Sequence, residues 1–181
     1  MMHAMRYTTL TTLALSQLIS TASHATPDYR THTLLDGLVS IDVPAPMKPM
    51  PPLMLKQKYP GNRRPPIAFS TEDGSVSIAL NYTNNHLTES GVDRAHRAMS
   101  DFFYRTYPLA RWHQNKITTV QGKKSFVFEL TTPATNATIH NLIYGIPVNQ
   151  RLLLVTFNTT LSQRQHWLPL GRVALNSLRI D

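Results

Sequence analysis

The sequence predicts an α+β domain in which an antiparallel β-sheet is flanked by helices. Apolar and polar residues alternate, as in half-buried strands, within two blocks, Leu38–Thr83 and Asn115–Thr160. Between them, apolar residues of Glu89–Tyr107 recur at three- and four-residue steps, which indicates a helix. A second helical segment, Ser162–Leu178, closes the chain. We therefore expect a single domain over residues 35–181, preceded by a signal peptide over 1–25 and an irregular lead-in over 26–34.

The N-terminus has the features of an export signal. The moderately apolar segment Tyr7–Ile19 follows a basic residue and is shorter than the ~20 residues that span a bilayer. Ser23 and Ala25 then occupy the small-residue positions of a cleavage site before Thr26. This predicts a periplasmic protein cut after Ala25. An amphipathic N-terminal helix of a cytoplasmic protein is the alternative.

The first elements of the domain are short. Leu38–Val43 alternates like a strand, and the next nine residues, Pro44–Pro52, contain five prolines, which predicts a stiff extended loop. We expect Leu53–Tyr59 to be a strand, ended by a turn over Pro60–Pro66. Ile67–Ser70 is predicted to be a further short strand.

The middle of the chain has the clearest patterns. Ser75–Thr83 alternates throughout and predicts a strand with one packed face. The helix over Glu89–Tyr107 follows, and Ser90 and Asp93 have the spacing of a capping box.

Four strands are predicted in the second half. Arg151–Thr160 contains the run LLLVTF, which is apolar at successive positions and therefore belongs in the middle of a sheet covered on both sides. The other three strands are Asn115–Val120, Lys124–Thr132 and Thr138–Val148.

The sequence contains no motif for catalysis. It has no cysteine, which excludes disulfides, thiolate catalysis and a cysteine-linked lipid anchor. Ser162 and His166 lie close together, but Ser162 and Gln165 have capping-box spacing, which gives the serine a structural role. Nucleotide-binding loops and metalloprotease motifs do not occur. We expect no catalytic residue, metal or cofactor, although strand pairing can bring His113 and His140 together, which leaves a metal site as an alternative.

The chain is basic, with 18 Lys and Arg against 10 Asp and Glu and a net charge of +8. An anionic partner or a merely basic surface both account for this charge. The predicted ligand-binding residues are Lys56, Lys58, Arg63 and Arg64, placed together on one expected hairpin, where they would otherwise protect an edge strand. Nucleic acid is not expected, because no aromatic platform interleaves the charges.

Four segments together resemble the PsbP-like, Mog-type superfamily, and most of all its DcrB-like bacterial periplasmic branch. They are GLVSIDVPAP, TEDGSVSIALNY, ITTVQGKKSFVFEL and LLLVTFNTTLSQRQHWLPLGRVALNSLRI. The resemblance implies an α/β/α sandwich and a binding role, since the superfamily is mostly non-enzymatic.

The sequence therefore predicts an exported, non-enzymatic protein-binding module of the bacterial cell envelope, with a role in assembly, stress or toxin immunity. Its partner is expected to be another protein, with neither nucleic acid nor stable membrane insertion involved. One alternative is a periplasmic binder of an anionic small ligand or envelope polymer through the basic hairpin. The other is a cytoplasmic secretion-effector chaperone, if the N-terminus is not a leader.

Overall fold

A computed structural model describes residues 27–61 and 64–181, and its architecture confirms the predicted α+β class. A seven-stranded antiparallel sheet has the order β3-β4-β5-β9-β8-β7-β6, so the apolar strand β9 lies at its centre, as expected. Its strands are β3 (Lys48–Pro49), β4 (Ile67–Ser70), β5 (Val76–His86), β6 (Arg111–Val120), β7 (Lys123–Pro133), β8 (Thr138–Val148) and β9 (Arg151–Thr160). The predicted leader lies outside the described residues.

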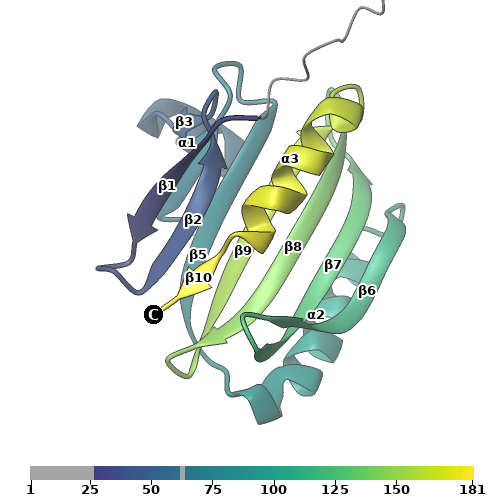
Figure 1. Ribbon diagram of the computed structural model, residues 1–181. Coiled ribbons are helices and arrows are strands. Elements are labelled where there is room, and N and C mark those ends of the chain that lie inside the picture. Colours follow the sequence, from purple (N-terminus) through teal and green to yellow (C-terminus); the bar gives the residue numbers. More distant parts are fainter. Residues whose placement is uncertain (1–26, 62–63) are drawn as a thin grey trace, which may run out of the picture.

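The two long helices cover opposite faces of the sheet (Figure 1). Helix α3 (Arg164–Asn176) lies over β9 and β8, beside a small sheet of β1 (Tyr29–Leu34), β2 (Val39–Pro44) and β10 (Arg179–Ile180). Helix α2 (Val92–Thr106) follows a 3-10 turn at Glu89–Gly91 and packs behind β6 and β7. The described helices therefore cover each face only in part, and within residues 27–61 and 64–181 no helix lies over β6 and β7 on the α3 side.

Strand alternation divides the core into two layers. Phe126, Phe128 and Leu130 of β7 face α2 and form one cluster with Val92. The larger cluster lies on the α3 side, where Val127 of the same strand joins residues of β2, β5, β9 and α3. Glu129 shares this side with Val127, because residues two apart on a strand face the same way.

Two predictions about the first elements are wrong. Leu53–Tyr59 is a helix rather than a strand: α1 spans Pro52–Lys58, with Pro52 at its first turn, where the missing N–H has no cost. The expected irregular lead-in contains strand β1, because Tyr29–Leu34 pairs with β2 along its whole length. Within the proline-rich loop, Lys48–Pro49 forms the short strand β3 at one edge of the sheet.

The capping box at the start of the first predicted helix is also absent. The hydroxyl of Ser90 forms a hydrogen bond of 3.0 Å with that of Thr88, and Asp93 pairs with Lys124 across 2.5 Å. The helix itself is confirmed.

Helix α3 begins without the expected serine cap. The hydroxyl of Ser162 lies 3.2 Å from that of Thr160, and Gln163 occupies the cap position without a side-chain bond to the helix. Pro169 lies inside one helix that continues to Asn176. No helix within 27–61 and 64–181 is long and apolar enough to span a bilayer.

Candidate binding face

The sheet surface beside α3 contains a buried carboxylate. Glu129 of β7 is only 3% exposed and accepts three side-chain hydrogen bonds. They come from Gln114 Nε2 of β6 at 2.5 Å, Arg172 NH2 of α3 at 2.6 Å and His140 Nε2 of β8 at 2.8 Å. Burial opposes ionisation of Glu129, but the hydrogen bonds from Arg172, Gln114 and His140 hold its pKa below the ordinary value. The carboxylate of Glu129 on β7 is thus hydrogen-bonded to side chains of β6, β8 and α3.

His140 lies beneath this surface, 1% exposed. Its Nδ1 atom is buried and has no hydrogen-bond partner among the described residues, while its ring lies 5.1 Å from that of His113. Burial lowers the pKa of His140, although Glu129 opposes the shift, so the imidazole is neutral at neutral pH. The two histidines meet because β6 and β8 both flank β7. The described residues contain no group of three or more histidine or carboxylate side chains placed to hold a metal.

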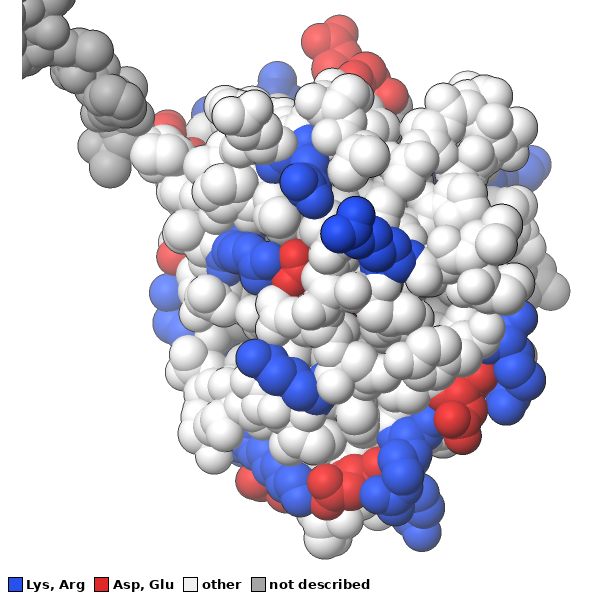
Figure 2. All heavy atoms as spheres, turned by 90° about the vertical axis from the view of Figure 1, so that its right-hand side faces the viewer, with Lys and Arg blue, Asp and Glu red and all other residues white. Residues whose placement is uncertain are grey.

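Basic side chains lie on the same side of the sheet as the buried pair: Arg111 and Lys116 lie opposite Thr131 and Val127 of β7, the two neighbours of Glu129 on that side. We call this surface the basic face and define it as Arg111, His113, Lys116, Arg164 and Arg172. Arg172 is partly neutralised by Glu129, whereas Arg111, Lys116 and Arg164 make no ion pair within the described part of the chain. Figure 2 looks at the β6 side of the molecule and shows several Lys and Arg side chains across its middle, with little Asp or Glu among them. The surface therefore attracts anionic groups.

The structure does not assemble the basic hairpin predicted from the sequence. Lys56 and Lys58 lie on helix α1, and Arg63 is outside the described residues. Lys58 donates to the carbonyl oxygen of Gly74 at 2.6 Å, and burial lowers the pKa of its amine. Arg64 Nε donates to the carbonyl oxygen of Tyr59 at 2.9 Å. The predicted hairpin was wrong because Pro52–Lys58 forms a helix. Ligand binding by these four residues stays a prediction.

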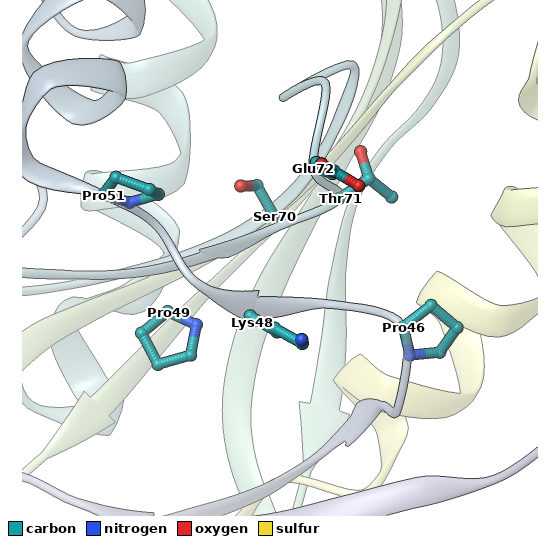
Figure 3. Close-up of a pocket in the computed structure, with 7 residues that line it drawn as sticks. All are labelled: Pro46, Lys48, Pro49, Pro51, Ser70, Thr71 and Glu72. Atoms are coloured by element: carbon teal, nitrogen blue, oxygen red, sulfur yellow. The ribbon is translucent and has the colours of Figure 1, made fainter.

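A shallow groove of about 440 Å³ lies at the opposite edge of the sheet, next to β3. Figure 3 shows proline rings along β3 on one side and the end of β4 on the other. Its lining residues are Pro46, Lys48, Pro49, Pro51, Ser70, Thr71 and Glu72. Lys48 and Glu72 carry opposite charges, so the groove does not select an anion. Pro49 has no N–H to offer a further strand, which closes this edge of the sheet.

The central residues of the basic face were not predicted as a site. A single glutamate within the apolar strand KSFVFELTT was the available signal, because a buried carboxylate requires partners. The identity of those partners depends on strand register and on where α3 docks.

Comparisons with known proteins show the fold alone. No protein-family model matches the chain, and neither does any curated protein. The solution structure of cyanobacterial PsbP (CyanoP) from Synechocystis is similar, with a TM-score of 0.60, 11% identity, and coverage of 91% of this chain and 99% of that one. A crystal structure of LpqN from Mycobacterium tuberculosis, described as involved in cell envelope biogenesis, gives a TM-score of 0.53, 8% identity and 87% coverage of both chains. The chain therefore has a PsbP-like fold, as the sequence predicted; its assignment to the DcrB-like branch stays a prediction.

Proposed function

We propose that this chain is an exported, non-enzymatic module of the bacterial cell envelope that binds an acidic partner protein on its basic face. The single observation that carries the proposal is a set of three cations near one buried carboxylate, Arg111, Lys116 and Arg164, which form no ion pair with any other described residue. The PsbP-like fold and the envelope role stated for LpqN support it.

The shape of the face favours a protein over a small molecule. The groove that borders it, lined by Thr118, Tyr144 and Asn176 among others, has a volume of about 240 Å³. Small-molecule sites usually enclose at least ~300 Å³ and bury most of the ligand. An open surface with exposed charges is instead typical of electrostatically steered protein association.

The test is capture from periplasmic extract with immobilised protein, followed by binding measurements with the purified partner. Charge reversal by Arg111→Glu with Lys116→Glu is expected to weaken binding by at least about tenfold, or ~1.4 kcal/mol. Binding by the wild type is expected to weaken as salt is added, because the charges are exposed.

The matched control reverses two charges elsewhere, Lys56→Glu with Arg64→Glu. This pair belongs to the alternative in which the N-terminal basic residues bind an anionic ligand or envelope polymer. We expect binding by the control to equal that of the wild type. If the control variant lost binding while the variant with Arg111→Glu and Lys116→Glu still bound the partner, the basic face would be refuted as the binding site.

A further inference from the structure

Strand β6 is an open edge of the sheet. It has ten residues and, within residues 27–61 and 64–181, pairs only with β7, whereas the other edge strand has two residues and includes Pro49. The β6–β7 hairpin turns at Gln121 and Gly122, whose φ angles of 49° and 73° are those of a type I′ turn. The pair flanking such a turn exchanges its backbone hydrogen bonds, and successive residues direct their N–H groups to opposite sides of the strand. The N–H groups of Asn115, Ile117 and Thr119 therefore point away from β7.

The two sides of this edge differ in chemistry. On the α3 side, Arg111 and Lys116 are exposed. On the α2 side, Trp112 and Ile117 are half-buried. Tyr104 of α2 is 51% exposed and its ring lies 4.7 Å from that of Trp112. A strand placed beside β6 would thus meet cations on one face and aromatic surface on the other.

We propose that the acidic partner binds by adding an extended strand to β6, a strand in which acidic and apolar residues alternate. The inference rests on the proposed function and names how the partner is recognised. Main-chain hydrogen bonds to the outward N–H and C=O groups hold the strand, and alternate side chains give specificity. The acidic residues face Arg111 and Lys116, and the apolar residues pack on Tyr104 and Trp112.

Charge selects against a second copy of this chain at the same edge. Pairing β6 with β6 would bring Arg111 and Lys116 of one copy close to the same cations of the other, and like charges across a strand pair are destabilising. An acidic strand is attracted by Arg111 and Lys116, so the same cations that prevent self-association favour binding of the partner.

The probe is a labelled peptide that alternates glutamate with valine, titrated by fluorescence anisotropy. Its control peptide has the same composition with the glutamates and valines in separate blocks. We expect the alternating peptide to bind at least about tenfold more tightly than the blocked one. Equal binding of the two peptides would overturn strand addition and leave only charge attraction.

Two neighbouring proline substitutions test the backbone. Thr119→Pro removes an outward N–H and is expected to keep the stability of the fold while weakening peptide binding by about tenfold. Thr118→Pro removes an N–H directed at β7 and is expected to destabilise the hairpin. Undiminished binding by a folded Thr119→Pro variant would refute the proposal.

A measurement on the wild-type protein remains decisive if either variant does not fold. Bound peptide is expected to slow amide hydrogen exchange at Asn115, Ile117 and Thr119, and unchanged exchange at these three would overturn strand addition. The two proposals fail in different ways. If the Arg111→Glu, Lys116→Glu variant loses binding but bound peptide does not protect the wild-type amides, the basic face is supported and strand addition is refuted. If that variant binds as the wild type does, the basic face itself is refuted.

Discussion

Replacing Arg172 by methionine tests how Glu129 holds α3 on the sheet. The substitution keeps most of the apolar stem of the side chain but removes the guanidinium that donates to Glu129 Oε1 at 2.6 Å. A hydrogen bond to a charged group contributes about 1.5–3 kcal/mol, and breaking a fully buried ion pair costs about 3–5 kcal/mol. Because the Arg172 side chain is 38% exposed, water replaces part of the lost interaction. We therefore expect Arg172→Met to lower the free energy of unfolding by about 2 kcal/mol.

The assay is denaturant unfolding at pH 7.5 followed by circular dichroism, with an unchanged m value as the check that only stability moved. Arg164→Met is the matched control, since Arg164 lies on the same helix, is exposed and makes no ion pair among the described residues. Its cost is expected to stay within about 0.5 kcal/mol. An equal effect of the two substitutions would show that the bond between Arg172 and Glu129 does not stabilise the fold.

Three further predictions concern pH, packing and export. The folded-state pKa of His140 is depressed below 6.5 and that of Glu129 below 4.5, so in each case the unfolded chain takes up the proton first. The free energy of unfolding is therefore expected to fall as pH drops below about 6.5 and again below about 4.5, and His140→Gln should remove the first loss in denaturant titrations across pH. Gly171→Ala would place a methyl group 2.5 Å from the ring of the fully buried Phe157. The expected net loss is about 1 kcal/mol by denaturant unfolding, because overpacking costs about 1–3 kcal/mol and the gain in helix propensity is about 1 kcal/mol; a more stable variant would contradict this. Expressed with its native N-terminus in a Gram-negative host, the protein is expected in the periplasm with the mass of a chain that starts at Thr26, and an uncut cytoplasmic product would contradict the leader.

The fold was predictable where alternation coincides with burial, and less so elsewhere. Ser75–Thr83 alternates cleanly because one of its faces packs under β2 and α3, and β5 forms there as expected. In Tyr29–Leu34 polar residues dominate, and pairing with β2 rather than burial makes it a strand. For the residues after Pro52, Leu, Met, Lys and Gln are strong helix formers without β-branching, a signal that favoured α1 over a strand.

The candidate site was less accessible to sequence reasoning. The contact between His113 and His140 was foreseen as one that strand pairing allows, and their rings do stack. The bond from Arg172 to Glu129 joins residues 43 apart and depends on where a helix docks, which no local pattern encodes.

The order of the strands also bears on when the chain can fold. β5 pairs with β9, in register from Val76 opposite Thr159, and β2 pairs with β10, where Val39 lies opposite Ile180. Strands β2 and β5 therefore pair with strands that are synthesised much later, and contacts between residues so distant in sequence form slowly. The small sheet cannot be completed before β10 has been made, and the seven-stranded sheet cannot be completed before β9 has been made. The N-terminal half consequently has no finished sheet of its own during synthesis, and the apolar faces of its strands stay uncovered until the later strands pair with them.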